Sequence, residues 1–230
     1  MKPEKEYRSY VNYFQKWEGA GITGLSMAAA GFLFLWLGFS YASYIISIVL
    51  MLLGLALFFY GSIGRAHEND LQNQIDRAMT AIEFKELEED TRHFFRRVPK
   101  TPEIREFGGY AMRQGLLIKR QKNGSLCSSE YTSAKMLLLT DAFYIKTSTF
   151  SFISNEKNKE THEILYSALE DITVERDRIN LTSGKSRFLA KTCHLCLHYD
   201  GGKSLLLPAK DDIYTDEFAN DLKRKLLGRD

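Results

Sequence analysis

Residues 19–64 read GAGITGLSMAAAGFLFLWLGFSYASYIISIVLMLLGLALFFYGSIG, a stretch of 46 positions without a charged side chain. At a rise of about 1.5 Å per residue, one helix of this length would measure roughly 70 Å, about twice the hydrocarbon thickness of a bilayer. Small polar and aromatic residues at 38–43 suit a turn at the membrane surface. The stretch therefore predicts two membrane-spanning helices, at about residues 21–39 and 44–63. A cleaved signal peptide would have a shorter apolar core, with the small residues behind it.

The charges that flank this hairpin predict its orientation. Basic residues precede the first span and follow the second, whereas the turn between them is uncharged; they are Lys2, Lys5, Arg8, Lys16, Arg65 and Arg77. Because positive flanks remain in the cytoplasm, both termini are expected there. Cys127, Cys193 and Cys196 all follow the hairpin, on the reducing side, so no disulfide is expected.

Small residues recur every seven positions in both predicted spans. The repeating positions are Gly24, Gly31 and Gly38 in the first span, and Ser47, Gly54 and Gly61 in the second. A seven-residue repeat keeps one helix face aligned, and small residues there allow close backbone approach in lipid. One interpretation is that the two stripes pack against each other within the hairpin. The other is that they drive self-association in the membrane.

The pattern divides the chain into four parts. These are a cytosolic N-terminal segment at 1–18, the hairpin at 19–64, an amphipathic helical stalk at 65–98, and a cytosolic domain at 99–230. The stalk carries an apolar stripe at Leu71, Ile75, Ala78 and Ile82, and is expected to continue unbroken out of the second span. The stripe suits either a coiled coil between chains or packing on the following domain. Pro99 and Pro102 end the helix.

After residue 101 the periodicity is typical of short strands separated by turns. Strands are predicted at 110–120, 136–139, 143–152, 164–166, 172–175, 187–190, 193–199 and 204–207. A helix is predicted at 211–227, where Ile213, Phe218, Leu222 and Leu226 form one stripe and Gly228 caps the end.

Two segments of this region resemble bacterial pleckstrin-homology (PH) and GRAM-type domains: LLLTDAFYI at 137–145 and YSALEDI at 166–172. The closing strand and helix complete the resemblance, which covers about residues 105–228. It implies a fold class of a membrane helical hairpin plus an α+β domain, namely a PH-like β-barrel of about seven strands with a C-terminal helix. These motifs are structural, so the resemblance implies a fold rather than an activity.

The sequence carries no recognisable enzyme signature. Gly184, Lys185 and Ser186 match the end of a P-loop, but Ile179 stands where its first glycine is required. No enzymatic activity and no cofactor are therefore expected. The region after the hairpin holds 27 basic and 26 acidic residues, a balance that does not favour direct nucleic-acid binding.

Two candidate sites follow from the chemistry of the side chains. If 193–198 is a strand, alternation places His194, Cys196 and His198 on one face, where their N and S donors suit zinc. The alternative is an ordinary half-buried strand. The second candidate is a group of basic residues around the first predicted hairpin: Arg113, Lys119, Arg120 and Lys122. If the PH resemblance holds, these residues are expected to contact anionic lipid. The alternative is an ordinary solvated hairpin.

The overall layout resembles the two-transmembrane effectors of bacterial antiphage systems, including the retron type. That resemblance implies an effector in the bacterial cell inner membrane that senses a signal or a partner and perturbs the membrane in abortive infection. Expected partners are membrane lipid, further copies of the chain, and a protein or ribonucleoprotein. The alternative function is a constitutive membrane-anchored module that docks lipid or protein.

Overall fold

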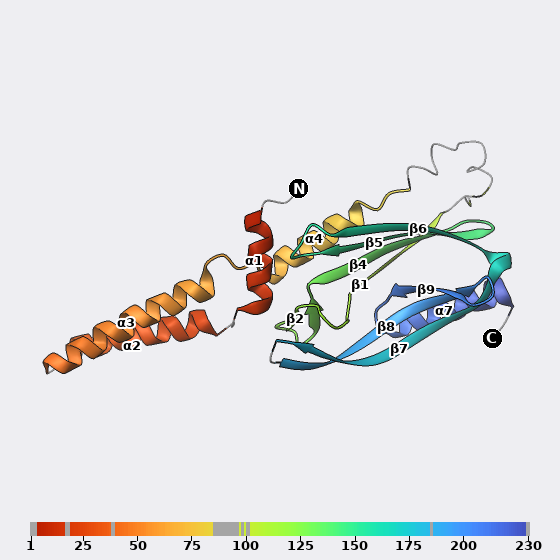
Figure 1. The fold of residues 1–230 in the computed structure, drawn as a ribbon. Helices are drawn as coiled ribbons and strands as arrows, with labels where there is room; N and C mark the ends of the chain where they lie inside the picture. Colours follow the sequence, from red (N-terminus) through yellow and green to blue (C-terminus); the bar gives the residue numbers. More distant parts are fainter. Residues whose placement is uncertain are drawn as a thin grey trace. The chain divides into compact units, whose positions relative to one another are not determined.

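The computed structural model describes residues 4–16, 19–37, 40–84, 97, 99, 102–184 and 186–228. The chain forms two compact units, Met1–His67 and Glu68–Asp230. The first is helical and the second is rich in β-sheet (Figure 1).

The described residues of the first unit form three helices: α1 (Glu4–Gln15), α2 (Ala20–Leu37) and α3 (Tyr41–Ser62). Figure 1 shows α2 and α3 side by side as a hairpin. Ser40 caps α3, because its hydroxyl accepts a hydrogen bond from the Ser43 amide while Ser43 Oγ accepts one from the Ser40 amide. Both helices are long and apolar enough to cross a membrane, close to the predicted bounds. The sequence pattern did not indicate α1.

The small-residue stripes of α2 and α3 pack against each other. Gly24, Gly31, Ser47, Gly54 and Gly61 are all buried. A Cβ atom on Gly31 would lie 2.8 Å from the Met51 amide nitrogen, and one on Gly54 would lie 2.6 Å from the Gly24 carbonyl oxygen. The two backbones thus approach more closely than any side chain allows. This is the first of the two predicted arrangements. Gly38 lies outside the described residues.

Side chains from α1 and the residue that follows it cap the C-terminal end of α3. The Lys16 ammonium donates hydrogen bonds to the carbonyl oxygens of Tyr60 (2.9 Å) and Ile63 (3.3 Å), and Asn12 Nδ2 donates to that of Gly64 (2.7 Å). A cation therefore satisfies carbonyl groups that a helix end leaves without partners.

The predicted stalk is not a continuation of α3, which corrects the expected unbroken helix. Ile63 is extended and Gly64 has a φ of +67°, a left-handed conformation that ends the helix. A separate helix, α4 (Glu68–Thr80), belongs to the sheet-rich unit. Leu71 and Ile75 of its stripe are buried, in agreement with packing on the domain. Residues 85–96 of the predicted stalk lie outside the described part.

The first sheet has the order β1–β4–β5–β6, and all of its pairs are antiparallel. Its strands are β1 (Glu103–Tyr110), β4 (Glu130–Leu138), β5 (Ala142–Ser151) and β6 (Lys157–Leu165). A small hairpin, β2 (Ile118–Arg120) with β3 (Leu126–Ser128), is inserted between β1 and β4. The single strand predicted at 110–120 is wrong, because the chain leaves the ladder after Tyr110 and turns through Gly115 with a φ of +89°.

The second sheet has the order β7–β8–β9 and follows a short 3-10 turn, η1 (Tyr166–Ala168). Its strands are β7 (Leu169–Ser183), β8 (Ser186–Tyr199) and β9 (Lys203–Pro208). The segments predicted at 187–190 and 193–199 are one strand. It pairs with β7 in one register from Ser186 to His198, and the register shifts between Leu169 and Asp171. Helix α7 (Ile213–Leu227) ends the domain, with Asp212 as N-cap and Gly228 (φ +61°) as C-cap, as predicted for that glycine.

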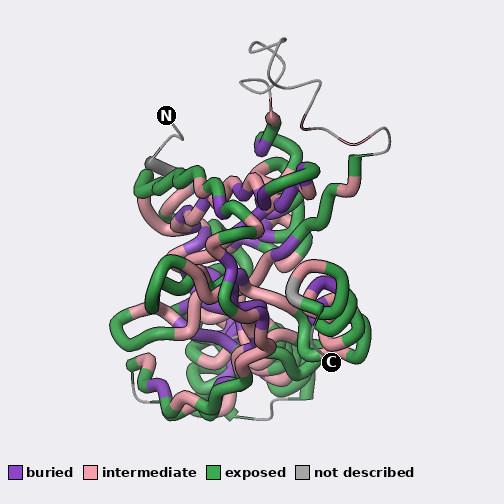
Figure 2. The backbone as a smooth tube through the Cα atoms, turned by 90° about the vertical axis from the view of Figure 1, so that its right-hand side faces the viewer, coloured by how far each residue is buried: buried purple, intermediate pink, exposed green. Residues whose placement is uncertain are grey.

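Both sheets and α7 contribute to one apolar core. Met136 and Phe143 from the first sheet, Leu195 and Leu207 from the second, and Leu222 from α7 belong to it. Figure 2 shows the buried segments gathered in the interior of this unit. Within the described residues the backbone ladders form three separate sheets and do not close into a barrel. The predicted seven-stranded barrel is therefore not confirmed.

Candidate functional site

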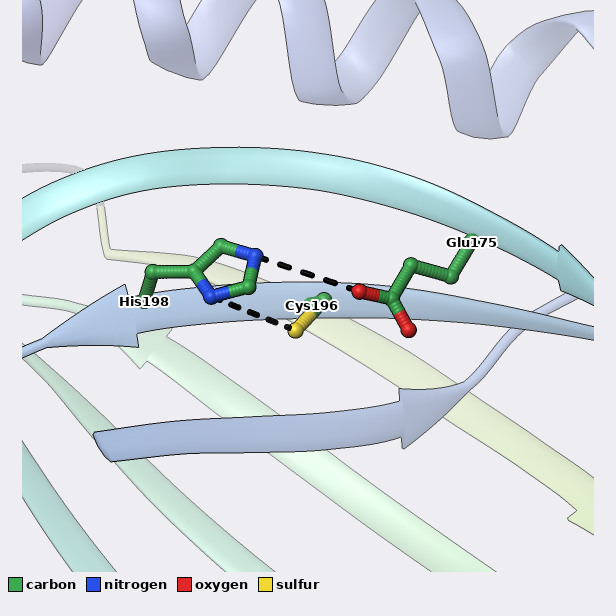
Figure 3. A group of neighbouring side chains, drawn as sticks. All are labelled: Glu175, Cys196 and His198. Atoms are coloured by element: carbon green, nitrogen blue, oxygen red, sulfur yellow. Dashed lines mark hydrogen bonds and ion pairs between the residues drawn. The ribbon is translucent and has the colours of Figure 1, made fainter. Parts of the chain in front are cut away.

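A cluster of one carboxylate, one thiol and one imidazole lies on adjacent strands of the second sheet (Figure 3). Cys196 and His198 are two residues apart on β8, and Glu175 lies on β7. His198 Nδ1 is 4.0 Å from Cys196 Sγ, and His198 Nε2 is 3.9 Å from Glu175 Oε1. His194, the third predicted zinc ligand, is not part of the cluster, and Glu175 takes its place.

The geometry joins the three groups through the imidazole ring. Each ring nitrogen of His198 faces a different partner, and Nε2 also lies 3.2 Å from Thr173 Oγ1. One donor atom from each of the three residues lies within 4.8 Å of the donor atoms of the other two. Cys, His and Glu are ligand types that zinc accepts. The zinc site thus stays a prediction, with Glu175 as the added candidate ligand.

Burial makes the Cys196 thiol a poor nucleophile. The side chain is almost completely buried. Burial, and then the neighbouring Glu175 carboxylate, raise the pKa of the Cys196 thiol to about 11. Because the thiolate is the reactive form, Cys196 is protonated and inert near neutral pH.

The four basic residues predicted to contact lipid do not form one surface. Arg113 forms an ion pair with Glu130 at 2.6 Å. Lys119 is buried and Arg120 is exposed. Arg120 Nη1 donates to the carbonyl oxygen of Gly124 at 2.8 Å. The Lys122 side chain is exposed on the turn beyond β2.

A different basic surface lies at the tip of the β7–β8 hairpin. Arg178 pairs in register with Lys191, and Arg187 lies two positions before Leu189 on the same face. All four side chains are exposed. The sequence signal for this surface is the alternation of Arg187, Leu189 and Lys191. It places the three side chains on one face only if residues 187–191 belong to a single strand.

Helix α4 packs on the first sheet, where it contacts β4. Gly108, Ser133 and Ser148 are cross-strand neighbours on β1, β4 and β5. Ser133 and Ser148 are buried, and neither hydroxyl has a hydrogen-bond partner among the residues that the structure describes. A groove of about 470 Å³ runs between α4 and α7, where Ile75 and Phe218 are among the residues that line it.

The chain matches no protein-family model, no curated protein and no solved structure. The described residues form an apolar two-helix hairpin and a sheet-rich domain with a C-terminal helix.

Proposed function

We propose that this protein is a non-enzymatic, membrane-anchored docking module of the bacterial inner membrane, with both termini in the cytoplasm. The observation that carries the proposal is the division of side chains in the hairpin. The small residues face inward, while Ile22, Trp36 and Leu52 are 76%, 82% and 62% exposed. A hairpin whose outer surface is apolar on this scale needs lipid around it.

The residues at the open end of the hairpin support the same placement. Tyr60 lies under the Lys16 ammonium at 4.7 Å, and the Arg65 guanidinium lies over the Tyr13 ring at 5.6 Å. Aromatic and basic side chains are enriched together where a helix leaves the hydrocarbon region. This end is accordingly the proposed cytoplasmic boundary.

We propose further that the sheet-rich unit is an open variant of the PH-like plan. Four strands in one meander, three in a second and a closing helix follow the order of that fold, with β2 and β3 as an insertion. The shared core of both sheets and α7 supports this assignment. Domains of this plan serve as docking surfaces for lipid or protein. The buried, unreactive thiol of Cys196 agrees with a docking role rather than a catalytic one.

A second candidate function is a restrained membrane effector, of the kind found in retron-type antiphage defence. The observation that favours it is the short connection between α3 and α4, from Ile63 to His67. A protein or ribonucleoprotein that displaces α4 from the sheet would act directly on the segment that follows the second membrane helix. In this function the outward apolar faces of the hairpin would support self-association and perturb the bilayer.

One experiment separates the two functions. The full chain is expressed in bacteria, its retention in the membrane pellet is measured after alkaline extraction, and membrane potential is followed over the same period. Retention with unchanged potential supports the docking module. Retention with rapid depolarisation, relieved by products of neighbouring genes, supports the effector. Release into the supernatant would contradict both.

A further inference from the structure

We propose that the tip of the β7–β8 hairpin is a second membrane contact, which binds an anionic lipid surface. The proposal rests on the membrane anchorage argued above, because the hairpin holds the domain near lipid. The basic tip is defined here as Arg178, Arg187, Leu189 and Lys191.

The two faces of the hairpin tip differ in composition. One face holds Leu181 and Ala190, which pack with Ile118 of β2 in a small apolar core. The opposite face is exposed throughout and carries the register pairs Arg178 with Lys191, Asn180 with Leu189, and Thr182 with Arg187. The exposed face therefore carries three cations and no anion, and the opposite face of the same two strands packs in the small apolar core.

Among the described residues, the cations of the basic tip differ from the neighbouring Arg176 in having no acidic partner. Arg176, next along the same face, binds Asp211 at 2.6 Å and Asp216 at 2.7 Å. Within the described part of the chain, no carboxylate forms an ion pair with a cation of the basic tip. Arg178 lies directly opposite Lys191, and like charges in that position repel each other. An anionic ligand would remove this repulsion.

Leu189 indicates which kind of anion the surface fits. Its side chain is 53% exposed between the two basic residues of β8, Arg187 and Lys191. A bilayer with anionic headgroups offers phosphate oxygens to the cations and an acyl region to the leucine. A single-stranded nucleic acid would need aromatic platforms for its bases, and the exposed face has none.

The test places a probe at the apolar centre of the basic tip. An environment-sensitive fluorophore is attached to L189C in the full chain, where the three native cysteines are buried. The chain is reconstituted in phosphatidylcholine vesicles with or without phosphatidylglycerol. We expect blue-shifted emission and quenching by lipid-borne quenchers only with the anionic lipid. The variants R178Q and K191Q should each weaken this signal roughly fivefold, and should raise thermal stability without lipid because they remove the repulsion.

Matched controls make the result specific. The same fluorophore at L165C, 45% exposed on β6, should remain in water, and K157Q with K159Q should leave the L189C signal unchanged. An aqueous L189C probe with anionic vesicles, an equal shift at L165C, or a shift with RNA but not with vesicles would each overturn the proposal. Alkaline extraction of the same vesicles reports separately on the hairpin, so loss of anchorage and loss of tip contact are distinguishable.

Discussion

Gly54 illustrates how one absent side chain determines the packing of the hairpin. A Cβ atom there would meet the amide nitrogen of Ala28 and lie 2.6 Å from the carbonyl oxygen of Gly24. Both of these atoms belong to the backbone, so neither moves aside as a flexible side chain would. The contact is one that only glycine permits.

We therefore expect G54L to separate α2 from α3, at a cost of about 3 kcal/mol or more from overpacking. The measurement is the melting of helical circular dichroism in detergent. L53A is the matched control, since Leu53 is the adjacent residue and is 53% exposed. Equal melting temperatures for G54L and the unmodified chain would show that the glycine face is not the packing surface.

Cys196 gives a second prediction at the residue scale. With the pKa of its thiol raised to about 11, chiefly by burial, alkylation should be slow at neutral pH and accelerate only as the pH approaches 11. E175Q removes a neighbouring negative charge, so it should lower this pKa and bring the acceleration to lower pH. Mass spectrometry of alkylated Cys196 across pH measures both effects. Rapid alkylation at neutral pH would contradict the assignment.

Metal analysis completes the test of this cluster. Stoichiometric zinc in the purified chain, lost in both E175Q and H198A, would establish Glu175 and His198 as ligands. Zinc lost in H194A but retained in E175Q would instead support the ligand set predicted from strand alternation. A chain that contains no metal would refute the zinc hypothesis.

At the scale of single elements, α4 packs on a part of the first sheet that contains buried polar side chains. It packs against β4, and the hydroxyls of Ser133 on β4 and Ser148 on β5 are buried without a hydrogen-bond partner among the described residues. Each such group typically costs about 1–3 kcal/mol. Helix α4 should therefore leave the sheet more readily than an element packed only through apolar groups.

Replacing both serines by alanine should stabilise the contact and slow amide exchange in α4 on the order of tenfold. Hydrogen exchange followed by mass spectrometry measures the rate for each segment. Thr192 on β8 supplies the control, because its buried hydroxyl is also unpartnered and T192V retains its shape. If the serine variants and T192V change α4 exchange equally, the effect is general and not a property of the α4 contact.

At the scale of the whole molecule, the division into two units predicts that residues 68–230 fold without the hairpin. The segment holds the shared core of both sheets and α7. Expressed alone, it should be soluble and unfold in one cooperative transition. Aggregation, or gradual unfolding, would show that the helical unit is needed for the sheets to form.

The same unit should lose stability in alkali. Burial raises the pKa of Cys196 from 9.0 to about 11 and that of Tyr166 from 10.0 to about 12. The folded state thus favours the neutral forms, so this contribution is complete below pH 9 and is lost as the pH rises toward 12. Thermal melting from pH 7 upward measures the loss. A constant melting temperature to pH 11 would contradict the assigned burial.

The sequence by itself determined the elements whose signals are local or periodic. These are the two apolar helices, the stripes that include Gly31 and Gly54, and the final helix with its cap at Gly228. The length, the periodicity and the capping residues of a helix all lie within one segment of the sequence, so they can be recognised without knowing which distant residues it contacts.

Only the tertiary structure decided which distant residues meet. It replaced His194 by Glu175 beside Cys196, broke the predicted stalk at Gly64, and joined two predicted strands into β8. It also separated Lys119 from Arg120 and paired Arg178 with Lys191. The physical reason is that strand register depends on pairing between segments far apart in the chain, and a shift of one residue moves every side chain to the opposite face.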